Sequence, residues 1–223
     1  ATVKTCKRDS DDFSSCLRLA IQEAWPTFVP GLPEFDIPPL DPYYTESYSM
    51  EHESGQLRGK ISIADVRLYG LAKSRFLSVK PEMDGDFFRL EIDVEIPKLL
   101  IDGDYKAEGS LATFKMGGKA TGFFNISMEN IRTVWDISGH VVNDRWVVEH
   151  FKTAPTISSM KVWFSDLFNG NEELNRAALV FINEYWPLVY RTMLPKLIEM
   201  WDTYLSEFSN RFFSKIPFST IFP

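Results

Sequence analysis

Residues 172–213 read EELNRAALVFINEYWPLVYRTMLPKLIEMWDTYLSEFSNRFF, and this stretch decides the fold. It holds no glycine, and most positions outside one stripe are large and apolar. The polar residues that share this stripe at the helical period are Arg176, Glu184, Arg191, Glu199, Asp202, Ser206 and Asn210. The pattern predicts a helix about 60 Å long. A helix this apolar must be covered over most of its circumference.

Two prolines lie inside this stretch. Pro187 and Pro195 each remove the helical hydrogen bond to the residue four before them. We therefore expect either a kink between Asn183 and Arg191 or two abutting helices.

Residues 43–168 have the pattern of strands. Residues 88–96 alternate without a break between apolar and mostly charged side chains, which predicts an antiparallel strand with one wet face. Shorter alternations follow at Phe124, Ile126 and Met128, and at Met160, Val162 and Phe164. The expected turns are Asp84-Gly85, Asp102-Gly103, Gly117-Gly118 and Asn143-Asp144. No βαβ alternation occurs, so we expect one antiparallel sheet.

The N-terminal part contains a short helix and a proline-rich arm. Within residues 1–30, apolar residues recur at helical spacing from Phe13 to Ala24, and Pro26 and Pro30 are expected to end the helix. Cys6 and Cys16 bracket its start, as a disulfide or as two buried free thiols. Residues 31–42 hold four prolines, which exclude a regular helix and predict an extended arm.

One arrangement of these elements buries the apolar surface of both the helix and the sheet. A sheet with one apolar face curves strongly around the long helix, because flat packing would leave half of the helix aromatics in water. We predict an α+β fold in one elongated domain, residues 1–223. It comprises the N-terminal helix (1–30), the arm (31–42), the curved sheet (43–168) and the long helix (172–213).

Composition excludes several classes of function. The net charge is −7 and no Lys/Arg cluster occurs, so nucleic acid is not an expected partner. No apolar run is long enough to span a membrane. The three histidines, His52, His140 and His150, do not cluster with the cysteines at metal spacing, and no cofactor is expected.

No motif of a known catalytic or nucleotide site occurs, so we expect no enzyme. Glu91, Asp93 and Glu95 are spaced two apart, and we interpret them as a solvated strand face.

Four segments together resemble the insect takeout and juvenile-hormone-binding protein family. They are the Cys6/Cys16 pair, the arm GLPEFDIPPLDP (31–42), the segment LFNGN (167–171) before the aromatic helix with Asn183 and Trp186, and the tail IPFSTIFP (216–223). The resemblance covers essentially the whole chain. With only two cysteines, the sequence is similar to the takeout branch, since the haemolymph hormone carriers have a second disulfide.

The resemblance implies an apolar tunnel between helix and sheet and a secreted, monomeric carrier without chemistry. Expected ligands are long hydrophobic molecules of terpenoid, fatty-acyl or quinone-like type, and an unidentified receptor is a further expected partner. The residues expected to line the tunnel are Phe88, Leu90, Ile92, Val94, Phe124, Ile126, Met128, Trp135, Met160, Val162, Phe164, Phe181, Tyr185, Val189, Met193 and Trp201. Ligand access is expected near the arm and the first helix.

Two alternatives stay open on sequence alone. The aromatic helix could be pure core, in a surface-interaction or signalling module, or the chain could be an enzyme acting on apolar esters. Separately, Asn125-Ile126-Ser127 fits the N-glycosylation pattern, with Asn125 on the wet face if Phe124 and Ile126 face inward.

Overall fold

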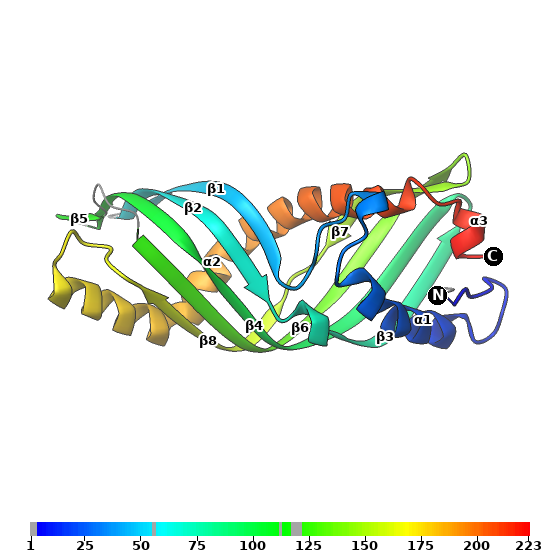
Figure 1. Ribbon diagram of the computed structural model, residues 1–223, viewed down its shortest axis with the longest axis horizontal. Helices are drawn as coiled ribbons and strands as arrows, with labels where there is room; N and C mark the ends of the chain where they lie inside the picture. Colours follow the sequence, from blue (N-terminus) through cyan, green and yellow to red (C-terminus); the bar gives the residue numbers. More distant parts are fainter. Residues whose placement is uncertain (1–3, 55–56, 112, 117–121) are drawn as a thin grey trace.

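A computed structural model describes residues 4–54, 57–111, 113–116 and 122–223. The helices and strands, apart from two 3₁₀ turns, are α1 (Phe13–Phe28), β1 (Tyr43–Ser54), β2 (Leu57–Tyr69), β3 (Arg75–Asp84), β4 (Phe87–Leu111), β5 (Phe114–Met116), β6 (Gly122–Val142), β7 (Arg145–Lys152), β8 (Thr156–Phe164), α2 (Glu172–Phe213) and α3 (Phe218–Ile221). Figure 1 shows a curled sheet with α2 running along it and α1 and α3 together at one end. This confirms the predicted α+β fold of a long helix with a curved antiparallel sheet.

The sheet is elongated because its two central strands change partners along their length. β4 pairs with β6 from Phe87 to Tyr105. In one half, β3 flanks β4 and β7 flanks β6. In the other half, β2 flanks β4 and β8 flanks β6, and β1 adds to β2. The same two long strands, β4 and β6, are therefore flanked by different strands in each half of the sheet.

The inward-facing residues change parity between the two halves. In β4, Ile96 is buried and Lys98 is exposed, yet Leu99 packs against the core. Opposite this point, Asn130 in β6 has a positive φ of 50°. Pro97 has no N–H to donate to a ladder, and the register omits the Pro97/Asn130 pair. In both strands the inward-facing positions shift by one residue here. A strict two-residue alternation therefore does not continue past Pro97 and Asn130.

Helix α2 is one continuous helix, so the alternative of two abutting helices is wrong. It begins after Asn171, whose side-chain oxygen accepts from the Leu174 N–H at 3.1 Å as an N-cap. Pro187 and Pro195 both lie inside it. Its axis changes direction along its length (Figure 1), as expected for a helix with missing hydrogen bonds.

Two of the predicted turns are confirmed and one is wrong. Asp84-Gly85 joins β3 to β4, and Asn143-Asp144 joins β6 to β7. Asp102-Gly103 instead lies inside β4. A Cβ at Gly103 would come within 3.1 Å of the Phe124 ring, so this glycine allows close packing rather than a turn. Gly117-Gly118 lies outside the described residues.

The N-terminal elements differ in detail from the prediction. α1 continues through Pro26 to Phe28, so Pro26 does not end it. The arm is not simply extended, because Leu32 and Ile37 form a β-bridge around a short 3₁₀ turn. Cys6 and Cys16 form a disulfide with Cα atoms 5.9 Å apart.

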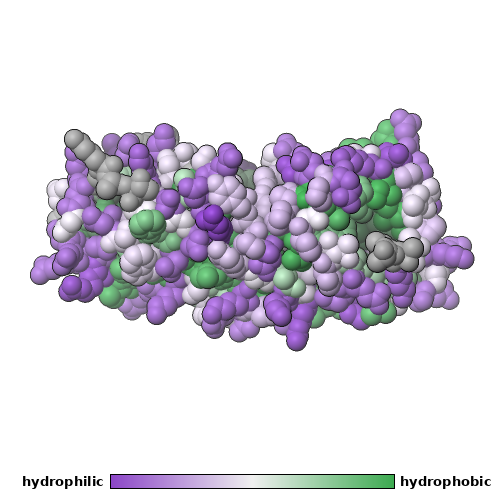
Figure 2. All heavy atoms as spheres, in the orientation of Figure 1, coloured by the Kyte–Doolittle hydropathy of each residue, from purple (hydrophilic) through white to green (hydrophobic). Residues whose placement is uncertain are grey.

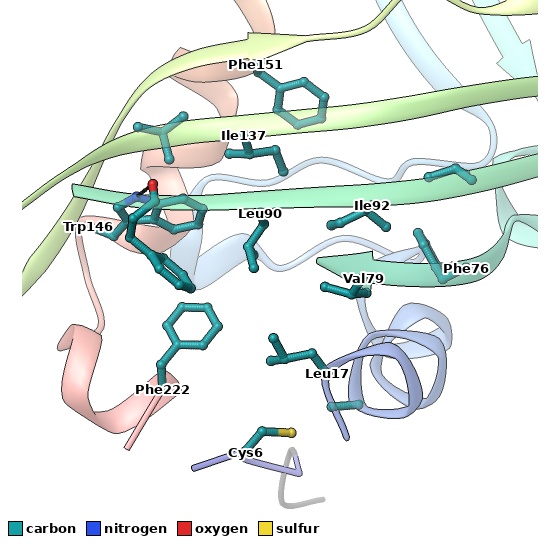
Figure 3. Close-up of a cluster of buried hydrophobic side chains, with 14 of the residues drawn as sticks. Cys6, Leu17, Phe76, Val79, Leu90, Ile92, Ile137, Trp146, Phe151 and Phe222 are labelled. Carbon is teal, nitrogen blue, oxygen red and sulfur yellow. Dashed lines mark hydrogen bonds between the residues drawn. The ribbon is translucent and has the colours of Figure 1, made fainter. Parts of the chain in front are cut away.

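A packed apolar cluster fills the space between the sheet and α1 and α3. Figure 3 shows Leu17, Phe76, Leu90, Trp146 and Phe222 pointing toward one another from five elements or segments. The Phe88 ring, in the same cluster, packs 5.0 Å from Trp146 and 4.9 Å from Phe222, between ring centroids. The C-terminal tail thus belongs to the core of this half.

Candidate functional site

The half formed by β2, β4, β6 and β8 presents rows of apolar side chains on its inner face. We call this surface the apolar floor; its cross-strand rows are Leu99–Met128–Met160, Ile101–Ile126–Val162 and Gly103–Phe124–Phe164. The structure thus brings six of the predicted lining residues side by side. Met128 is buried, while Ile126, Met160, Val162, Phe124 and Phe164 keep part of their surface accessible.

Sequence reasoning missed Leu99 and Ile101, which belong to the same floor. The uninterrupted alternation ends at Ile96, and the parity change at Pro97 hides the next inward positions. A proline that interrupts an alternating strand was the signal that could have found them.

Another four predicted residues lie in the packed half. Phe88 and Val94 have no accessible surface, and Leu90 and Ile92 are each 4% exposed. All four belong to the packed cluster around Trp146. Trp135 is half-buried and packs against Trp25, Phe76 and Phe151 with ring centroids 5.6–6.1 Å apart. Their role in ligand contact stays a prediction.

The five predicted residues of α2 fall into two groups. Val189, Met193 and Trp201 are half-buried. Phe181 and Tyr185 are 56% and 46% exposed, with their rings 5.0 Å apart. The helix is therefore less covered than its apolar composition predicts, because the sheet curls as a half-barrel and α2 lies mainly against β7 and β8.

Polar side chains of α2 fasten it to the free edges of these two strands. The Asn183 amide accepts from the Val162 N–H at 2.7 Å and donates to the Val162 carbonyl at 2.9 Å. Asn210 makes the same pair of bonds to Val148, at 2.8 and 2.9 Å. We call these two contacts the amide clasps.

A carboxylate adds to the clasps in the β7 half. Asp202 accepts from the Phe151 N–H at 2.7 Å and contacts the His150 ring at 2.9 Å. Edge strands have unpaired backbone groups, and side chains on the polar stripe of α2 satisfy some of them. Part of the stripe therefore faces the protein rather than water.

A cavity of about 600 Å³ lies at the seam between β8 and the first turns of α2. The side chains that line it are Met160, Lys161, Arg176, Leu179, Val180, Asn183 and Glu184. Its apolar residues come from both elements, and its three charged residues are exposed. We call it the seam cavity.

The outer face of the sheet carries ion pairs rather than a carboxylate site. Arg132 donates to both oxygens of Asp93, at 2.9 and 2.7 Å, which lowers the pKa of that carboxyl. Glu91 pairs with Arg89 at 2.9 Å, and Glu95 lies 3.9 Å from Arg75. The interpretation of these acids as a solvated strand face is consistent with this placement.

His140 and His150 each contact a different carboxylate, Glu149 and Asp202 respectively. His140 bonds Glu149, and this hydrogen bond raises the pKa of the imidazole above its ordinary value. Across the described residues, no three His, Cys, Asp or Glu side chains are arranged to hold a metal ion. No helix in the part of the chain that the structure describes is long and apolar enough to cross a membrane.

Asn125 is exposed on the outer face, beside a second cavity of about 820 Å³ that Trp163 and Asp102 also line. Its neighbours Phe124 and Ile126 belong to the apolar floor. The predicted orientation of this strand is therefore present, while glycosylation stays a prediction.

Known proteins share this fold and sequence over nearly the full chain. The circadian clock-controlled protein daywake of Drosophila melanogaster is 25% identical over 233 residues, which cover 99% of this chain and 86% of that protein. Daywake of Drosophila yakuba is also 25% identical, with the same coverage. The crystal structure of Takeout 1 from Epiphyas postvittana superposes with a TM-score of 0.78, at 23% identity and 99% coverage of both chains.

The family model described as haemolymph juvenile hormone binding protein matches residues 1–223. Members of this family bind hydrophobic ligands, which agrees in kind with the apolar floor beneath α2. The chain belongs to the haemolymph juvenile hormone binding protein family, which includes the takeout-like proteins.

Proposed function

We propose that the protein is a secreted carrier that holds long hydrophobic molecules between α2 and the sheet, in an internal tunnel, and does no chemistry on them. One observation carries the proposal: the only buried residue of α2 is the small Ser206, which is still 9% exposed. Large side chains such as Trp186, Met193 and Trp201 are only half-buried, so part of their apolar surface stays accessible. A solid core would remove that surface.

The ligand would be bound by burial of its apolar area. Removing apolar surface from water contributes roughly 25 cal/mol per Å², or about 0.8 kcal/mol per methylene. Flexible Met side chains on the floor adapt to ligands of different shape. This supports long terpenoid, fatty-acyl or quinone-like molecules over short ones.

Secretion is supported by the disulfide and by the family's haemolymph description. Figure 2 shows hydrophobic side chains gathered at the surface between α1 and the C-terminal part of α2, which supports ligand access at that end. The exposed Asn125 supports glycosylation in a eukaryotic secretory host. A receptor and the monomeric state remain expectations.

Binding by delipidated protein tests the proposal. Displacement of a fluorescent apolar probe is measured for a homologous series of methyl esters from 8 to about 18 carbons. Each added methylene should increase affinity about threefold to fourfold until the space is full. Native mass spectrometry of protein purified without detergent should show a bound lipid. No displacement by any ester, with no lipid in the spectrum, would favour the solid-core module.

The enzymatic alternative has its own measurement. Clean protein incubated with the same esters should leave them intact over days. Release of the free acid at a rate that scales with protein concentration would instead support an esterase.

A further inference from the structure

We propose that the seam cavity binds the anionic head of an amphiphile, so that the preferred ligands are long-chain carboxylic acids rather than neutral esters. The inference rests on the proposed function, because the hydrocarbon chain of such a ligand needs apolar surface nearby. It adds a charged subsite that selects among hydrophobic molecules.

The charged side chains of the seam cavity give the first argument. Lys161 from β8 and Arg176 from α2 both line the cavity and are both exposed. Neither forms an ion pair with a carboxylate of the described residues. In a chain of net charge −7, two unpaired cations from different elements on one cavity are a local excess of positive charge. Glu184 lines the same cavity and opposes it.

The apolar residues carry the second step. Met160, Leu179 and Val180 line the cavity together with the charges; Met160 and Leu179 are half-buried, and Val180 is exposed. Met160 is also the end residue of one row of the apolar floor, opposite Met128. A molecule with its head at the cations therefore meets hydrocarbon surface continuous with the floor. This arrangement matches a single chain with one acidic end.

The rigidity of the seam carries the third step. Asn183 lines the cavity; its amide nitrogen donates to the Val162 and Leu179 carbonyls, both at 2.9 Å, and its oxygen accepts from the Val162 N–H. The clasp holds α2 at a fixed position against β8. Lys161 directly precedes Val162, and Arg176 lies two turns before Asn183. Both cations are thus mounted on elements that the clasp joins.

The test compares oleic acid with methyl oleate, below the aggregation concentration of the acid. The native protein should bind the acid about fivefold to tenfold more tightly than the ester, as charge-assisted contacts at an exposed site allow. The double substitution Lys161→Gln with Arg176→Gln should abolish this preference by weakening the binding of the acid. Glu184→Gln should increase the preference, because it removes the opposing charge.

Arg191→Gln is the matched control, since Arg191 is exposed on α2 but does not line the cavity. It should retain the preference for the acid. All four positions are exposed, and unchanged thermal unfolding temperatures would show that each variant folds.

Four outcomes would overturn the proposal. Equal affinity of the native protein for acid and ester would remove the charged subsite while leaving the carrier function intact. A preference that survives the double substitution would place the head elsewhere. Recruitment to phosphatidylglycerol vesicles that depends on these cations, without preference for the free acid, would assign them to a membrane surface. Failure of both ligands to bind would instead remove the carrier function and the subsite together.

Discussion

The side-chain amide of Asn183 bonds both backbone groups of Val162, accepting at 2.7 Å and donating at 2.9 Å. At Val162, the amide makes the two hydrogen bonds that a neighbouring strand would make along the free edge of β8. Asn210 does the same for Val148 on β7. The helix and the sheet are therefore joined by directional bonds as well as by apolar contact.

Substitution Asn183→Asp should destabilise the protein by about 1–3 kcal/mol. The carboxylate keeps the acceptor for the Val162 N–H but turns the donor into a second acceptor facing the Val162 carbonyl. Chemical unfolding measures the loss. Glu184→Ala, one residue along and exposed, is the control and should stay within about 0.5 kcal/mol. An equal effect of the two substitutions would contradict the role of the clasp.

Phe88 and Phe124 should behave differently although both face inward. Phe88 has no accessible surface, so Phe88→Leu should cost about 1–2 kcal/mol of stability and leave the affinity for methyl oleate unchanged. Phe124 is half-buried on the apolar floor, so Phe124→Ala should weaken binding about tenfold. Unfolding and probe displacement, measured on both variants, decide the matter. A large loss of affinity in Phe88→Leu would place the ligand in the packed half.

Glu149→Gln should lower the pKa of His140 toward its ordinary value of 6.5, because the hydrogen bond with Glu149 is the largest cause of the rise and the charge of Glu149 adds to it. The imidazole chemical shift followed by NMR against pH measures it. Glu129→Gln, an exposed change on the same strand, is the control and should leave the His140 titration unmoved. An unchanged titration in Glu149→Gln would show that the two side chains do not interact in solution.

The same pair gives a window of pH for stability. Folding raises the pKa of His140, so its contribution is complete below pH 6.5 and is lost as pH rises through the raised pKa. Folding lowers the pKa of Glu149, so that contribution is complete above pH 4.5 and is lost as pH falls through the lowered pKa. The stability difference between native protein and Glu149→Gln should therefore be largest between pH 4.5 and 6.5.

Gly139→Ala should destabilise the protein far more than Gly103→Ala. A Cβ at Gly139 would lie 1.8 Å from the Val147 carbonyl oxygen, where only a backbone shift at the β6–β7 bulge could make room. At Gly103 the closest atoms would be 3.1 Å away. We expect losses of about 3 kcal/mol or more against about 1 kcal/mol, measured by thermal unfolding. The reverse order would show that the close contact at Gly139 is absent in solution.

The long helix and the sheet were predictable because single patterns determine them. A stretch without glycine and with a helical polar stripe specifies α2, and unbroken alternation specifies the first part of β4. The disulfide was one of two alternatives that close spacing left open. The six floor residues of β6 and β8 followed from their own short alternations.

Other features depend on contacts between distant segments, which periodicity does not contain. Gly103 follows an aspartate as turn glycines do, yet its reason is the Phe124 ring from another strand. Asn183 and Asp202 are polar residues on a helix, which a helical plot assigns to solvent, yet each bonds a strand edge. The incomplete cover of α2 depends on how far the sheet curls, and composition does not determine that.

The parity change at Pro97 and Asn130 makes the two halves of the barrel separate units of variation. A one-residue shift in strand register confined to one half would exchange the inward-facing and outward-facing residues of that half. The inward-facing residues of the other half would stay the same. The floor could thus be exchanged between relatives as a block, for example by grafting residues 98–128 with 157–164, while the half stapled by the cysteines continues to support folding. In this fold, binding preferences can change in one half while the packed cluster around Trp146 in the other half stays the same.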